Sequence, residues 1–227
     1  MTALGGHRSV CAIIPARRSA AARVARALPT LLLLARPALA DDAPWARVGE
    51  HDGIVVERHE VAGTHLHEVR VSTHSPLPPA AILATRWRQQ DFPQFVPYVD
   101  RVDVLEDDGD TKLFYEQLSI PLVRDRDVVL RAVRHVDATT GAAEVVTRAV
   151  TDAGPPERRD HVRVRTSESR WELAPTADGG SDVRYTIRTD VGGFLPSFVV
   201  NAAQRDATPK MVRAILDRAG RGISATP

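Results

Sequence analysis

The second half of the chain is a succession of short extended segments, and one long helical segment follows them. Apolar and β-branched residues predict strands at 99–105, 112–120, 126–137, 144–150, 161–173 and 183–189. Turn signals separate them at 107–110, 138–141, 154–156 and 178–180. Because hairpins join antiparallel neighbours, this succession predicts that these strands form an antiparallel meander.

The last of these segments shows most clearly that one face is buried. Val183, Tyr185 and Ile187 alternate with polar residues, as expected for a strand with one buried and one solvated face. A helix is predicted next, from Pro196 to about Ala219, and Gly220 is expected to stop it. Its apolar stripe is predicted at Val199, Ala203, Ala207, Met211 and Ile215, and Pro209 is expected to kink it.

Fewer elements are predicted before the meander. Residues 45–53 form a short lead-in that could be one amphipathic helix, and strands are predicted at 54–61 and 66–72. The proline-rich segment 75–79 opens a helix that ends near 91–93, with Ile82, Leu83 and Trp87 on one face. The whole order predicts an α+β fold in which a curved antiparallel sheet wraps around the long C-terminal helix. Such a sheet can enclose a cavity.

The first forty residues are predicted to be a signal peptide. They contain six arginines and no acidic residue, followed by an apolar run at 31–35. Ala38-Leu39-Ala40 suits signal peptidase, so the mature chain is expected to start at Asp41 and to be secreted or periplasmic. An arginine-rich organelle transit peptide is the alternative. The domain is then expected at 41–220, with a disordered tail at 221–227.

Charge and cysteine content narrow the functional classes. Outside residues 1–40 the chain has 24 basic and 29 acidic residues, a formal charge of −5, which argues against a nucleic-acid-binding surface. The single cysteine, Cys11, lies in the predicted signal peptide, so neither a disulfide nor a cysteine-bound metal is expected in the mature chain. No run approaches the roughly 18 apolar residues of a membrane span.

Several short sequence motifs, in this order and spacing, resemble those of a known protein family. They are Trp45 with 52–56, then 95–97, 126–131, 171–175 and 193–196, followed by Asn201. Together they resemble the START (steroidogenic acute regulatory protein-related lipid transfer) family over roughly residues 45–219. One departure is Val128, where the family commonly has phenylalanine. We take this to reshape the cavity wall without changing the fold.

The resemblance implies a helix-grip fold whose tunnel holds one sterol, phospholipid or other lipid. Related helix-grip families include aromatase/cyclases that act on polyketides, so the fold alone does not decide the function. The candidate ligand-binding residues are Phe114, Glu116, Arg126, Val128, Leu130, Trp171, Phe194 and Asn201. The partners expected are a lipid or sterol-like ligand and, transiently, a membrane, with the protein itself a monomer.

Glu116 and Arg126 are the most informative candidates. In their predicted strands both share a face with apolar residues, Glu116 with Phe114 and Arg126 with Val128. A buried unpaired charge costs several kcal/mol, so two buried charges are expected to pair. START proteins often place such an acid and arginine in the lipid cavity. The functional interpretation is a polar anchor for the ligand, and the alternatives are a structural salt bridge at the sheet end or two exposed strand-end charges.

Other candidates have structural alternatives too. Trp171 either contacts the ligand or fills the core, and packing explains Phe194, Leu195 and Phe198 as well as a tunnel mouth does. Arg131 shares its strand face with Asp127 and Val129, and this face is expected to meet water.

The sequence gives little support for catalysis or metal binding. The eight histidines form no recognisable ligand set, and segment 107–110 lacks the distal glutamate of a calcium loop. No nucleophile elbow, phosphate-binding glycine loop or cofactor motif occurs. We therefore expect no enzyme and no cofactor. The alternative is a cyclase-like or hydrolytic enzyme on the same fold, with Glu116 as its acid or base, and a weaker one is a groove that binds a partner segment.

Overall fold

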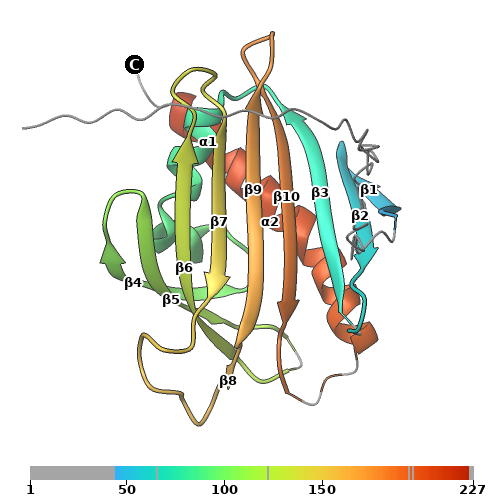
Figure 1. Ribbon diagram of the computed structural model, residues 1–227, viewed down its shortest axis with the longest axis vertical. Coiled ribbons are helices and arrows are strands. Elements are labelled where there is room, and N and C mark those ends of the chain that lie inside the picture. Colours follow the sequence, from blue (N-terminus) through green and yellow to red (C-terminus); the bar gives the residue numbers. More distant parts are fainter. Residues whose placement is uncertain (1–43, 65, 122, 194, 196, 225–227) are drawn as a thin grey trace, which may run out of the picture. The chain divides into compact units, whose positions relative to one another are not determined.

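Over the described part of residues 44–224, one largely antiparallel sheet of ten strands dominates the computed structural model, with two α-helices and a 3-10 helix on its concave side (Figure 1). The strands are β1 (Ala46–His51), β2 (Ile54–Glu60), β3 (His67–Ser75), β4 (Val99–Asp107), β5 (Thr111–Leu118), β6 (Arg126–Val136), β7 (Ala143–Ala149), β8 (Val162–Arg163), β9 (Thr166–Pro175) and β10 (Ser181–Asp190). The helices are α1 (Pro79–Arg86), the 3-10 helix η1 (Gln89–Gln94) and α2 (Ser197–Ser224). The predicted α+β class, with a long antiparallel sheet and a long C-terminal helix, is confirmed.

The structure describes residues 44–224 except positions 65, 122, 194 and 196, and only the backbone at 197–199, 223 and 224. The predicted signal peptide, residues 1–40, and the candidate Phe194 therefore lie outside the described residues.

The sheet order is β1-β2-β3-β10-β9-β7-β6-β5-β4, and short β8 adds to β6 in parallel. β3, the last of the three N-terminal strands, thus pairs with the last strand, β10, while the meander continues on the other side of β10. β1 and β4 are the two edges of the sheet. Register shifts interrupt their pairing at Arg47/Gly49 in β1 and at Val99/Arg101 and Val104/Glu106 in β4.

The lead-in at 45–53 is a strand, so the expectation of an amphipathic helix is wrong. β1 pairs with β2 through a two-residue turn, because His51 lies opposite Ile54. Asp52 and Gly53 form this turn with φ of 50° and 75°. Asp-Gly favours positive φ at both central positions of a two-residue hairpin turn. This dipeptide therefore indicates a β-hairpin at this place in the sequence.

The predicted helix after Pro79 is divided in two. α1 ends at Arg86, and η1 continues the chain before the strand β4. Ile82, Leu83 and Trp87 are buried, as their common face predicted. The break lets η1 bring Phe92 into the main core.

A second, small cluster lies on the convex face, which was expected to meet water. Leu113, Tyr115 and Val129 are buried there, and so is Asp127. The segment that follows β7 covers them: a Cβ on Gly154 would lie 2.6 Å from a methyl group of Val129. Asp127 accepts two hydrogen bonds of 3.0 Å from Arg163 and one of 2.9 Å from Tyr115.

The prediction that this face of β6 meets water is therefore wrong for Asp127 and Val129 only. Arg131, two residues beyond Val129, is exposed as expected. The predicted strand 161–173 is likewise divided, because β8 leaves the line of β9 to pair with β6.

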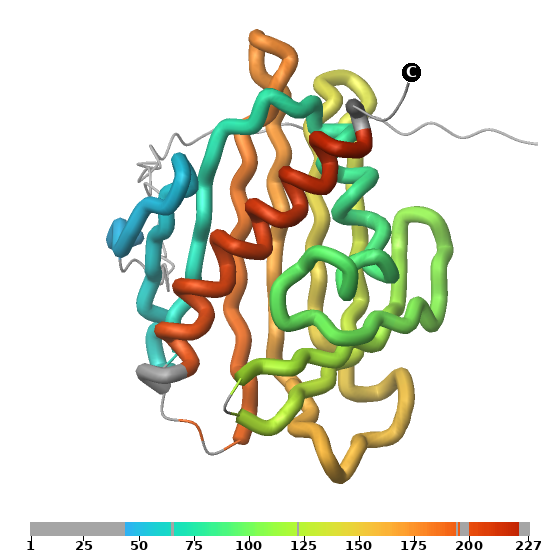
Figure 2. Tube along the Cα trace, turned by 180° about the vertical axis from the view of Figure 1, so that it is seen from behind, coloured from blue at the N-terminus to red at the C-terminus, as the bar shows by residue number. Residues whose placement is uncertain are grey.

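Helix α2 crosses the concave face of the sheet diagonally (Figure 2). Its buried stripe is formed by Val200, Gln204, Thr208, Val212, Ile215, Leu216 and Ala219. The predicted stripe is therefore wrong at Ala203, which is exposed, and right at Ile215. The helix also continues past Gly220 to Ser224, so the predicted helix end near Ala219 is too early. Glycine disfavours a helix by about 1 kcal/mol without forbidding it.

Candidate functional site

A cavity lies between the concave face of the sheet and α2, with about 1130 Å³ of empty space, part of it continuous with solvent. Its wall is mostly apolar, with contributions from Phe92, Phe114, Leu118, Val128, Leu130, Ile187 and Met211. Tyr98 is the most exposed of the described lining residues, at 39%, and marks the side where the cavity meets solvent.

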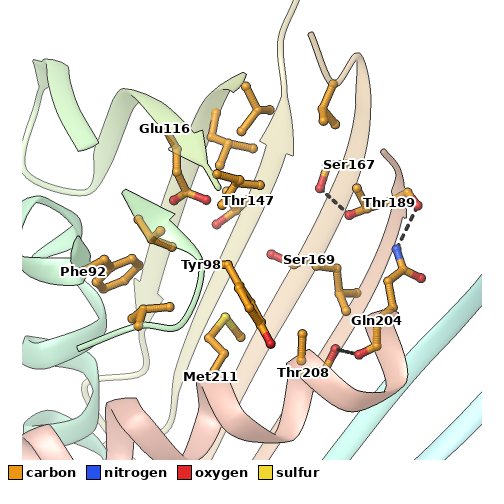
Figure 3. Close-up of a pocket in the computed structure, with 18 of the residues that line it drawn as sticks. Phe92, Tyr98, Glu116, Thr147, Ser167, Ser169, Thr189, Gln204, Thr208 and Met211 are labelled. Atoms are coloured by element: carbon orange, nitrogen blue, oxygen red, sulfur yellow. Dashed lines mark hydrogen bonds between the residues drawn. The ribbon is translucent and has the colours of Figure 1, made fainter. Parts of the chain in front are cut away.

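The alternation of side chains along the strands (strand parity) correctly placed four of the candidates on the cavity wall. Phe114 and Glu116 line it from β5, and Val128 and Leu130 line it from β6. Glu116 lies opposite Val128 in the β5–β6 pairing. The carboxyl group of Glu116 points into the cavity (Figure 3).

The environment of Glu116 disfavours its charge. Burial raises the pKa of this carboxyl from 4.5 to about 7, and the positive charge of Arg86 lowers it in part. Within the described chain Glu116 has neither a hydrogen bond nor an ion pair that would hold the carboxylate. A carboxyl in this state exchanges its proton near neutral pH, so it can donate or accept a hydrogen bond.

Arg86 is the buried basic residue that sequence analysis missed. It reaches the cavity wall from the last turn of α1, and its Nη2 donates to Thr147 Oγ1 at 3.2 Å. Its Nη1 is buried without a hydrogen-bond partner. Burial lowers the pKa of Arg86, whereas Tyr185 and Glu116 raise it. The spacing in the sequence could have predicted its burial, because Arg86 follows Ile82 by four residues and so lies on the same buried face of the helix.

Arg126 does not pair with Glu116, and that prediction is wrong. Arg126 lies opposite Leu118, its Nη1 donates to the carbonyl oxygen of Arg124, and it does not line the cavity. Its side chain approaches Gly193, where a Cβ would lie 3.9 Å from Nη2. Parity correctly predicted that Arg126 is buried, at 2% exposure. It could not predict that the long side chain would turn toward the end of the sheet.

Trp171 and Asn201 also lie off the cavity wall. Trp171 is buried in the main core, with its ring 4.9 Å from that of Tyr185, which agrees with the core-filling alternative. Asn201 Oδ1 accepts a hydrogen bond of 3.3 Å from the backbone N–H of His67. Asn201 therefore ties the start of α2 to β3.

Tyr185 completes the polar part of the wall near Arg86. Burial raises the pKa of its phenol to about 12, and a hydrogen bond with Ser169 acts in the opposite direction. The phenol therefore stays protonated and remains a hydrogen-bond donor at neutral pH. The cavity thus combines apolar walls with one acid, one arginine and several hydroxyl groups.

Neither a metal cluster nor a membrane helix is found in the described part of the chain. No group of three or more His, Cys, Asp or Glu side chains there could hold a metal ion. None of the helices in residues 44–224 is both long and apolar enough to cross a membrane.

Comparison with known proteins decides the family. The sequence model of the START domain family matches residues 27–221. The chain belongs to the START domain family. A solved STAR-related lipid transfer protein from Xanthomonas axonopodis superposes with a TM-score of 0.71 at 26% identity, covering 77% of this chain and 98% of that one.

Two curated proteins are similar to this chain in sequence. The uncharacterized protein PA1579 of Pseudomonas aeruginosa is 28% identical, over 75% of this chain and 83% of its own. Human phosphatidylcholine transfer protein is 27% identical, over 79% of this chain and 85% of its own. This START chain therefore matches a protein named for lipid transfer over most of the length of both.

Proposed function

We propose that this START domain binds a lipid or another hydrophobic small molecule in the cavity under α2 and transfers it between membranes. The observation that carries the proposal is the largely apolar cavity that the sheet and α2 enclose. Burial of apolar surface contributes roughly 0.8 kcal/mol per methylene, so a long chain or ring system would bind well with few polar contacts. The names of the human and Xanthomonas relatives support the same function.

Glu116 and Arg86 serve in this proposal as the polar anchor. Arg86 Nη1 is a buried donor without a partner, and Glu116 offers a carboxyl group in the same cavity. A carbonyl, phosphate or hydroxyl oxygen of the ligand would satisfy Arg86. The anchor would therefore orient the ligand, while the apolar wall supplies most of the binding energy.

The cellular setting is also part of the proposal. Export after cleavage behind Ala40 would place a monomer in the periplasm or outside the cell, where it contacts membranes transiently. Movement of α2 would open the cavity, with Gly192 and Gly193, both at positive φ, giving the preceding segment its freedom.

We propose no catalytic step. The alternative, a cyclase-like or hydrolytic enzyme, has one observation in its favour: a buried carboxyl with a pKa of about 7 is poised for acid–base catalysis. It would act on a substrate bound in the same cavity.

Native mass spectrometry of protein purified from its own host tests the proposal. We expect a co-purified lipid, released on denaturation, and transfer of a labelled lipid between vesicles. Arg86→Met should weaken ligand binding about tenfold or more, since it removes charge-assisted hydrogen bonds. Arg88→Met is the matched control, because Arg88 is exposed and pairs with Asp91 on the surface. An empty cavity without transfer, but with turnover of an added substrate, would favour the enzyme instead.

A further inference from the structure

One part of the cavity wall is lined with hydroxyl groups in an order that the sheet register defines. Four inward-facing residues of three neighbouring strands form it: Thr147 of β7, Ser167 and Ser169 of β9, and Thr189 of β10. Thr147 lies opposite Ser169, and Ser167 lies opposite Thr189. We call these four residues the hydroxyl track.

Both ends of the track continue into other polar residues of the wall. At one end Arg86 Nη2 donates to Thr147 Oγ1 at 3.2 Å. At the other end Gln204 of α2 donates to the carbonyl oxygen of Thr189 at 2.8 Å. Between them the hydroxyls of Ser167 and Thr189 are 2.7 Å apart (Figure 3). Polar groups therefore lie along the wall from α1 across the sheet to α2.

The track retains unused hydrogen-bonding capacity. Arg86 Nη1 and Gln204 Oε1 are buried and have no partner, although both residues line the cavity. The pair Ser167–Thr189 shares one proton, which leaves the other hydroxyl proton free to donate. Burying such groups without partners costs free energy, and valine or alanine would fill these strand positions without that cost.

Most of the remaining wall is apolar. Phe92, Phe114, Leu130 and Met211 line it from η1, β5, β6 and α2. With about 5 Å between strands and about 3.3 Å per residue along a strand, the track spans roughly 12 Å. A flexible acyl chain has no polar group to place over this length.

We infer that the ligand is a rigid amphiphile, such as a fused-ring compound, with several hydroxyl or carbonyl groups along one edge. Its polar edge lies on the hydroxyl track, and its opposite face packs against the apolar wall. This inference rests on the proposed function and specifies its ligand class.

Three probes test the inference by calorimetric titration of the protein: cholic acid, 5β-cholanic acid and stearic acid. The first two share one ring skeleton and carboxylate, and only cholic acid carries ring hydroxyls. Ser169→Ala and Thr189→Val together should weaken cholic acid binding about tenfold, at about threefold per hydrogen bond lost. The affinities for 5β-cholanic acid and stearic acid should stay within about twofold.

Thr186→Val is the matched control, because Thr186 is on the same strand as Thr189 and outside the cavity. Thermal melts verify folding, and Ser169→Ala alone repeats the test if the double variant is unstable. Equal losses for both steroid acids, or no loss, would overturn the inference while leaving the proposed function intact. So would binding of stearic acid alone. Failure of all three probes to bind would also overturn the inference, whereas the co-purified lipid and the vesicle transfer assay decide the proposed function separately.

Discussion

Replacing Glu116 with glutamine measures how strongly the cavity disfavours this carboxylate. Glutamine keeps the size of the side chain and removes its titration. The pKa of Glu116 is raised from 4.5 to about 7 in the folded protein. Between these pH values the folded state keeps a proton that the unfolded state has released, so the stability of the native protein falls as pH rises. Above pH 7 the loss is complete.

The magnitude follows from the same two values. About 2.5 pH units at 1.36 kcal/mol each give a loss of about 3 kcal/mol at pH 8, and much less at pH 5. Because Glu116→Gln escapes this loss, the variant should be about 3 kcal/mol more stable than the native protein at pH 8. At pH 5 the difference should be below about 1 kcal/mol, because this pH lies only 0.5 unit above the ordinary pKa of 4.5.

Urea denaturation at the two pH values checks this prediction. Glu106→Gln is the control, since Glu106 is exposed on the edge strand β4 and should show no such difference. A gain from Glu116→Gln that is the same at pH 5 and pH 8 would refute the reasoning. The carboxyl would then be solvated, and the anchor would lose its basis.

Three further predictions concern the core, the helix α2 and the N-terminus. Trp171→Ala should cost about 3–5 kcal/mol in urea denaturation, because Trp171 is buried in the core; a loss below 1 kcal/mol would contradict this placement. Asn201→Ala removes the hydrogen bond between α2 and β3 and should speed ligand release about fivefold in stopped-flow displacement; an unchanged rate would mean that the ligand leaves elsewhere. N-terminal sequencing of the native protein should find Asp41 first, and retention of Met1 would disprove export.

Local patterns in the sequence predicted much of the fold, because alternation along a strand is a property of the strand itself. The parity of β5 and β6 therefore placed Phe114, Glu116, Val128 and Leu130 correctly. What failed depended on contacts distant in sequence. Asp127 looked solvated because the covering segment around Gly154 comes more than twenty residues later.

The site was predicted less well than the fold, for a related reason. Apolar residues were used to find buried helix faces, so the polar members of those faces were overlooked. Arg86 of α1 and Gln204 and Thr208 of α2 occupy buried positions that apolar residues usually take. The sequence therefore predicted a strand residue, Arg126, as the partner of Glu116, which has no ion pair in the described part of the chain.

The open edges of the sheet bear on how this protein behaves in solution. A free edge offers unpaired backbone groups to any other strand, and a regular edge invites aggregation. β1 and β4 are irregular, since register shifts interrupt both, and β4 carries Asp100, Arg101, Asp103, Glu106 and Asp107. Strands of a second molecule would meet kinked backbone and like charges there. A sheet that stays open to hold its cavity can in this way avoid edge-to-edge polymerisation.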